Sequence, residues 1–127
     1  MQKLVFHPAW DRTISEKDRM KIEETFQQTV HSINNEIKIL PLWQAENHLG
    51  DLLVTTLIHN KTSNDLSFHN QLIKYVIKDE TVATHTFNIP DLLIKNETSM
   101  PWTFIFPEEK WRQFKLNQIG KIYLENL

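Results

Sequence analysis

The hydrophobic pattern of the chain changes at residue 36, and this change limits the fold more than any other feature. Before it, apolar residues recur at the spacing of one helix face: Ile22, Phe26, Val30 and Ile33. Beyond it, apolar and polar residues alternate in short runs separated by polar turns, which is typical of antiparallel strands. We therefore predict a mainly β protein, an antiparallel β-sandwich of immunoglobulin- or fibronectin-like type over about residues 36–127. One N-terminal amphipathic α-helix, at about residues 14–31, precedes it, and residues 1–127 are expected to form a single domain.

The N-terminal segment is expected to reach the helix through a turn. The apolar run at residues 4–6 predicts a short edge strand. In HPAWD, at 7–11, the proline disfavours helix in the residue before it, so we predict a turn there. Thr13 and Glu16 have the spacing of a capping box, with Thr13 as N-cap. The helix is expected to fray at residues 31–35, where two asparagines lower its propensity.

Residues 37–59 predict an edge strand followed by a central one. Pro41 interrupts the first strand and donates no ladder hydrogen bond, so we expect the strand to bend or to lie at a sheet edge. Its alternation places four side chains on one face: Ile37, Ile39, Trp43 and Ala45. The second strand, residues 52–59, is apolar on both faces, which is typical of a strand covered on both sides.

The rest of the sandwich is predicted from a hairpin and a final strand. Residues 71–78 and 81–89 alternate as two partners, with the tight turn expected at Asp79-Glu80. Residues 90–99 are expected to bulge outward from the sheet. Residues 121–126, KIYLEN, predict the last strand.

An aromatic stripe between two prolines offers two interpretations. Trp102, Phe104 and Phe106 share one side of an extended strand, and Pro101 and Pro107 delimit it. The stripe is either a wall of the core or an exposed platform for a sugar or a peptide. A platform usually comes with polar groups aimed at its ligand, and the opposite face of this strand offers few. We therefore predict that the stripe is core.

Composition excludes several classes of partner. The net charge is −2, from 14 basic and 16 acidic residues, which predicts no nucleic-acid partner and no polybasic membrane anchor. The chain has no cysteine, so it can form neither a disulfide nor a thiolate metal site. The apolar window before His7 is shorter than the 7–15 residues or so of a signal sequence and the roughly 20 of a membrane span. We expect no membrane insertion and a cytoplasmic location.

The residues that carry chemistry are scattered along the chain. No two of the six histidines have the short spacing of helical metal ligands, although His59 and His85 would meet if their strands were neighbours. The paired acids Asp79-Glu80 and Glu108-Glu109 fall in predicted turns, where carboxylates are usually solvated. We therefore predict no catalytic residue, no metal site and no cofactor, and hence no enzyme.

Two tryptophans are the candidate interaction residues. Trp43 follows Pro41 on the predicted edge strand, and Trp111 lies in a polar neighbourhood. Exposed tryptophans often anchor protein interfaces, whereas half-buried ones simply pack at the rim of a core. Trp43 and Trp111 therefore mark a candidate interaction surface, with rim packing as the alternative.

Three segments of the chain resemble a known family. LVFHPAWD at 4–11 and MPWTFIFPEE at 100–109 resemble the two ends of the SLAP domain of Firmicutes, and LLVTTLIHN at 52–60 resembles a strand between them. The resemblance implies a β-sandwich with an N-terminal helix. It also implies an association with S-layer assembly and an accessory secretion system, and it assigns no functional residue. The chain carries one copy of the domain, where some members carry two.

These observations together predict a non-enzymatic protein-interaction module. Its partner would be a second copy of the chain, giving a homodimer, or a component of a secretion system. Addition of a strand to a sheet edge is the simplest physical mode, and the groove between helix and sheet is a second place for a partner. The alternative from another class is a carbohydrate- or cell-wall-binding sandwich that uses Trp43 or Trp111 as a stacking plate.

Overall fold

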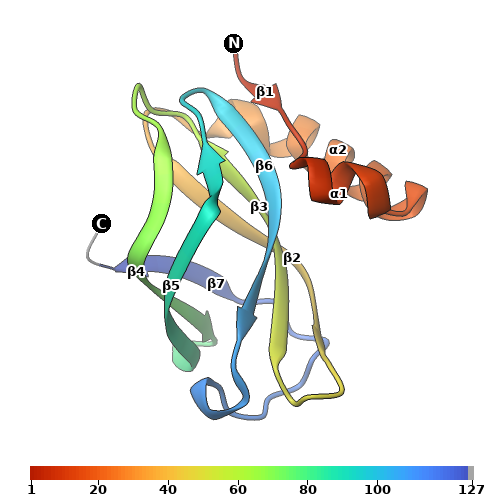
Figure 1. Cartoon of the computed structure of the whole chain (residues 1–127), viewed down its shortest axis with the longest axis vertical. Coiled ribbons are helices and arrows are strands. Elements are labelled where there is room, and N and C mark those ends of the chain that lie inside the picture. The colour runs from red at the N-terminus through yellow and green to blue at the C-terminus, as the bar shows by residue number, and fades with distance from the viewer. Residues whose placement is uncertain (126–127) are drawn as a thin grey trace.

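A computed structural model, which describes residues 1–125, shows two β-sheets packed face to face. The first sheet has the order β1-β6-β3-β2, formed by Lys3–Leu4, Thr98–Phe106, Leu52–Asn60 and Ile37–Glu46. The second has the order β5-β4-β7, formed by Glu80–Ile94, Leu66–Ile77 and Lys121–Glu125. Helices α1 (Pro8–Thr13) and α2 (Glu16–Thr29) lie beside the first sheet, on the side away from β4 and β5 (Figure 1). The predicted fold class, a β-sandwich with an N-terminal helix, is confirmed.

Among residues 1–125, the strand order corresponds to that of strands A to F of an immunoglobulin-type sandwich. Strands β2, β3 and β6 take the positions of A, B and E, and β5, β4 and β7 those of C′, C and F. All of these neighbours pair antiparallel, whereas the short β1 joins β6 in parallel. Among residues 1–125 no strand occupies the position of G, which would lie beside β7.

The aromatic stripe is part of the core between the sheets, as predicted. Phe104 and Phe106 are fully buried, and the ring of Phe87 from the second sheet lies with its centroid 5.3 Å from each. Trp102 is half-buried at the margin of the same cluster. Both sheets therefore contribute aromatic rings to one apolar layer.

A second core lies between α2 and the outer face of the first sheet. Ile22, Phe26 and Val30 pack with Leu57 of β3, and the Phe26 ring stacks on the ring of His59. This packing explains why β3 is buried on both faces, so the predicted apolar stripe of the helix and the predicted central strand are both confirmed. The helix gives way to a 3₁₀ turn at Val30–Ser32, close to where fraying is predicted.

The predicted turn at HPAWD and the predicted cap at Thr13 are wrong. Residues 8–13 form α1, and His7 caps this helix by accepting a hydrogen bond from the Ala9 N–H through Nδ1 at 3.1 Å. A proline disfavours helix before itself but is favourable at the first helical position, so the same residue starts the helix. The N-cap of α2 is Ser15, whose hydroxyl accepts from the Asp18 N–H at 3.1 Å.

The β4–β5 hairpin differs from the prediction in its turn and in its second strand. The turn is Lys78-Asp79, with φ of 50° and 68°, one residue earlier than expected. Positive φ at both positions matches the twist of a two-residue hairpin. Strand β5 runs on to Ile94 instead of bulging outward at residues 90–99. It absorbs three extra residues between Ile89 and Leu93, because Leu92 and Ile94 are buried in the core.

The last predicted strand is confirmed as β7 over residues 121–125, and Asn126 of that prediction lies outside the described residues. Within the described part of the chain, no helix combines the length and the apolar character that crossing a membrane requires. The 3₁₀ turn η2, Glu108–Lys110, and a coil that contains Trp111 connect β6 to β7.

Candidate functional site

The open side of the sandwich is a groove between the edge strands of the two sheets. It has a volume of about 610 Å³ and is lined by residues 36–41, mainly of β2, and by residues 120–124, mainly of β7. Within residues 1–125, β2 pairs only with β3 and β7 pairs only with β4. Each strand therefore turns one row of backbone N–H and C=O groups away from its own sheet, the arrangement to which a further strand can pair.

The groove has an apolar floor and polar rims. Ile39 belongs to the sandwich core, and Ile37, Ile122 and Leu124 pack against that core. At the rims Lys38 and Lys121 are exposed, and Tyr123 retains 46% of its accessible surface. An extended segment in the groove would alternate between the apolar floor and these polar rims, as a strand requires.

A hydrogen-bond network ties the loop before β7 to β2. The Tyr75 hydroxyl donates to the Gln44 side-chain oxygen and accepts from the Gly120 N–H at 3.0 Å. The Gln44 amide donates to the Leu116 carbonyl at 2.9 Å. Burial raises the pKa of Tyr75, and the hydrogen bond from Gly120 partly offsets this rise. The network fixes the end of the groove at which β7 begins.

Gly120 sets the distance between β7 and β4. A Cβ at this position would lie 2.2 Å from the Val76 carbonyl oxygen and 2.7 Å from Ile77 Cγ1, and backbone cannot move aside as a flexible side chain can. We expect Gly120→Ala to lower the free energy of unfolding by about 1–3 kcal/mol through overpacking. It should also speed amide hydrogen exchange in β7. Urea denaturation and hydrogen exchange measure both effects.

The matched control for Gly120→Ala is Ile119→Ala, because Ile119 is the preceding residue and is 49% exposed. We expect the control to leave exchange in β7 unchanged. If the amides of β7 exchange in Gly120→Ala at the same rate as in the wild-type protein, the assigned contact between residue 120 and β4 would be contradicted.

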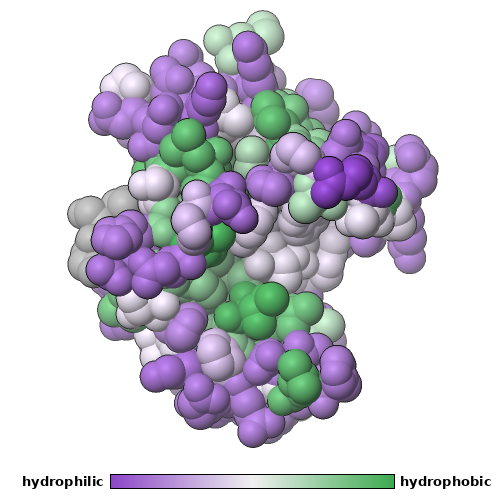
Figure 2. Space-filling view, in the orientation of Figure 1, coloured by the Kyte–Doolittle hydropathy of each residue, from purple (hydrophilic) through white to green (hydrophobic). Residues whose placement is uncertain are grey.

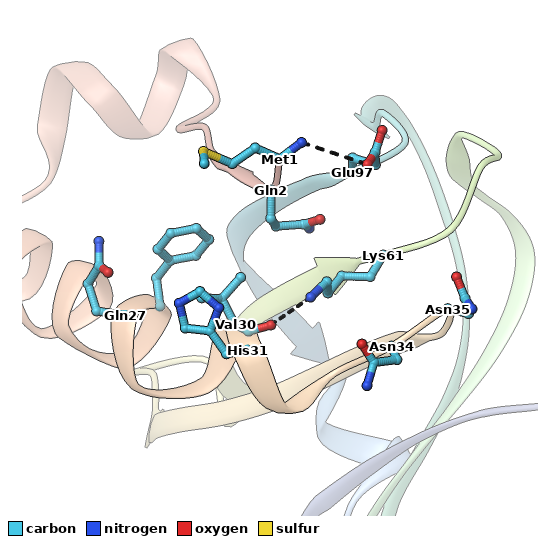
Figure 3. Close-up of a pocket in the computed structure, with 10 residues that line it drawn as sticks. Met1, Gln2, Gln27, Val30, His31, Asn34, Asn35, Lys61 and Glu97 are labelled. Atoms are coloured by element: carbon cyan, nitrogen blue, oxygen red, sulfur yellow. Dashed lines mark hydrogen bonds and ion pairs between the residues drawn. The ribbon is translucent and has the colours of Figure 1, made fainter.

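A second pocket lies between the end of α2, the start of the chain and the loop after β3 (Figure 3). Its volume is about 710 Å³, larger than that of the edge groove. Its charged groups already have partners in the fold, since Lys61 Nζ donates to the Val30 carbonyl at 2.8 Å and Glu97 lies 3.9 Å from the amino group of Met1. Unlike the groove between β2 and β7, this pocket is not flanked by two open strands.

Trp43 lies on the outer face of the first sheet, opposite to the expected face. The register of β2 shifts between Pro41 and Trp43, so Ile37 and Ile39 point into the sandwich. Trp43 instead packs in the second core, between α2 and the first sheet, which we call the helix cluster. A bulge of this kind reverses the side on which later residues fall. The ring is half-buried, and Lys21 Nζ lies 5.7 Å from its centroid.

Trp111 is also half-buried and lies in the connection between β6 and β7. Its indole N–H donates to the Gly50 carbonyl at 2.9 Å, and its backbone bridges to Ala83 of β5. Its ring meets the ring of Phe114 edge to face at 6.0 Å. Neither tryptophan lines the edge groove, and the structure does not bring the two together in one surface. The sequence signals for the groove itself were Pro41, which predicted a bent or edge strand, and the last strand predicted at residues 121–126.

The two histidines singled out from the sequence lie in different sheets, His59 on β3 and His85 on β5. His59 is fully buried, with Nδ1 2.6 Å from the Ser99 hydroxyl and Nε2 2.9 Å from the Thr29 hydroxyl. Burial, together with a smaller contribution from the positive charge of Lys61, lowers its pKa to about 4. The ring therefore joins β6 to the end of α2 as a neutral group. Across residues 1–125, no three acidic or histidine side chains gather as a set of metal ligands.

The surface does not provide one large apolar face in the view drawn. Figure 2 shows hydrophobic residues as separate patches among hydrophilic ones. This face therefore does not offer a broad hydrophobic surface for a partner. The groove between β2 and β7 instead combines apolar side chains with free backbone groups.

The comparison with protein families identifies the class to which this sandwich belongs. The family model of the SLAP domain matches residues 4–122, from β1 into β7. The chain is a member of the SLAP domain family, and the resemblance seen in its sequence is confirmed. Comparisons with curated proteins and with solved structures found no significant match.

Proposed function

We propose that this SLAP domain is a non-enzymatic protein-interaction module that binds an extended polypeptide segment in the edge groove between β2 and β7. The observation that carries the proposal is that two open strand edges flank one apolar groove. Main-chain hydrogen bonds to an edge would supply affinity. Alternate side chains of the bound segment would reach the floor made by Ile39 and Ile122 and supply selectivity.

The family supports a role for this binding in protein secretion or S-layer assembly. We propose that the domain acts in the cytoplasm, before its partner is exported, and that the partner is a secretion component or another copy of the chain. A segment not yet folded at that stage is extended and presents free backbone groups, so it suits an open edge.

Site-specific photocrosslinking tests this proposal. A photoreactive amino acid replaces Lys38 on the β2 rim or Tyr123 on the β7 rim, and the protein is expressed and irradiated in cells of a Firmicute. We expect covalent adducts with protein at both positions, because both side chains border the groove. Gel mobility and mass spectrometry identify the adducts.

The control places the same photoreactive residue at Lys17, which is exposed on α2 and lies outside the groove. Adduct yields at positions 38 and 123 no higher than at position 17 would contradict binding in the groove. Adducts concentrated at position 17 would move the interaction surface to the helix.

A further inference from the structure

Within residues 1–125, the groove between β2 and β7 leaves room for one more strand beside β7, and the sequence of β7 suits that position. We propose that a second copy of this chain occupies the groove, with the two β7 strands pairing antiparallel around Tyr123. The inference deepens the proposed function and rests on it, because it names the occupant of the same groove. The product is a two-fold symmetric dimer in which the β5-β4-β7 sheets of both copies form one continuous sheet.

The topology fixes where an added strand goes. In an immunoglobulin-type sandwich, strand G lies beside F, which is the position of β7 here. No strand of residues 1–125 fills this position, which opens onto the groove whose apolar floor contains Ile39 and Ile122. A β7 strand from another copy, lying antiparallel to the first, would have the direction that strand G takes.

The sequence of β7, KIYLE, complements itself in this arrangement. When Tyr123 of one copy opposes Tyr123 of the other, Lys121 opposes Glu125 and Glu125 opposes Lys121. These three residues share the outer face, because Tyr123 lies opposite Lys74 of β4. Ile122 and Leu124 oppose each other on the inner face, above the groove.

Other registers lose this match. A shift by one residue would bring Lys121 opposite Leu124 and turn apolar side chains to the wrong face. A shift by two residues in one direction would place Lys121 opposite Tyr123, and a shift by two in the other direction would place Glu125 opposite Tyr123. Either shift removes both ion pairs and shortens the paired length of the strands. The Tyr123-centred register is therefore the one that satisfies both faces.

The charges at this edge are available for the pairing. Among the described residues, no ion pair involves Lys121. Glu125 lies 3.6 Å from Lys74 Nζ, and because both side chains remain close to half exposed, a carboxylate oxygen can accept from a further cation. Exposed ion pairs contribute little affinity, so these charges would select the register while backbone bonds and Ile122 hold the dimer.

A charge-swap experiment tests the dimer. Sedimentation velocity over a range of protein concentrations at low salt gives the dimer dissociation constant. Lys121→Glu would place Glu opposite Glu at both pairs, and Glu125→Lys would place Lys opposite Lys. We expect each variant to weaken the dimer at least tenfold. The equimolar mixture of the two should form a heterodimer of near wild-type affinity, because every opposed pair is then Lys with Glu.

Two controls separate pairing from general effects. Lys17→Glu makes the same change of charge on α2, and we expect wild-type dimerisation from it. The double variant Lys121→Glu/Glu125→Lys carries both substitutions yet complements itself, so it should dimerise again. Circular dichroism verifies that each single variant is folded, and recovery in the mixture excludes misfolding as the cause of dissociation.

The outcomes distinguish this inference from the proposed function. A wild-type protein that stays monomeric up to millimolar concentration, or a dimer that neither single variant weakens, would overturn the β7 dimer. A mixture that fails to restore the dimer would overturn it too. If the β7 dimer is overturned but photocrosslinking at positions 38 and 123 still gives adducts with another protein, the proposed function stands and that protein occupies the groove. If no groove adduct forms either, both proposals fall.

Discussion

Replacing Phe104 by alanine is expected to lower the free energy of unfolding by about 3–5 kcal/mol. The side chain is fully buried, and its ring centroid lies 5.6 Å from that of Phe68 and 5.3 Å from that of Phe87. It therefore joins the two sheets, and its removal leaves a cavity that neither sheet can close alone. Urea denaturation monitored by tryptophan fluorescence measures the loss.

The matched control for Phe104→Ala is Ile105→Ala. Ile105 is the next residue on β6, and 48% of its surface is exposed on the other face of the sheet. We expect it to cost less than about 1 kcal/mol, the range of strand propensity alone. Similar losses at both positions would contradict the assignment of the stripe to the core, since only one of the two side chains lies between the sheets.

Acidification from pH 6.5 to pH 4 is expected to destabilise the protein by about 3 kcal/mol through His59 alone. In the folded protein the pKa of His59 is lowered to about 4, mainly by burial and to a smaller extent by the positive charge of Lys61. In the unfolded chain the pKa is about 6.5. As the pH falls, the unfolded chain takes up the proton first, so this part of the stability is fully present above 6.5 and is lost progressively toward pH 4.

A pair of histidine variants isolates this effect. In His59→Gln the free energy of unfolding should depend much less on pH between 7 and 4.5, even though the variant is less stable overall. His31→Gln, at an exposed histidine, should keep the wild-type slope. An unchanged slope in His59→Gln would show that the buried ring is not the group that takes up the proton on unfolding.

Periodicity predicted the buried face correctly wherever the element is regular, because periodicity is a property of consecutive residues, and it failed at Trp43, where the register of β2 shifts. The stripe of Ile22 and Phe26 defines the buried face of a helix whatever the helix packs against, and both side chains are buried. In the same way the alternation of Phe104 and Phe106 places both on one side of a strand. The motifs at the two ends were also sufficient to recognise the family.

Local competition between conformations caused the errors near the helices. The residues at 7–13 are compatible with a turn and with a short helix, and Pro8 has a favoured role in either. The hydroxyls of Thr13 and Ser15 both have the chemistry of an N-cap. Packing of Trp10 and Ile14 with the helix cluster selects the short helix and moves the cap to Ser15.

The sequence by itself determined the long helix, most of the strands and the family, because these follow from neighbouring residues. Pro41 predicted that β2 bends or lies at an edge, and β2 does both, but only the tertiary structure decided that β7 is also an edge and that residues 36–41 meet residues 120–124 at one groove. It also decided that Trp43 points away from that groove, since one shifted residue in β2 reverses its face. Long-range pairing is the reason, because a groove between two sheets is formed by the relation between strands and not by the residues of either one.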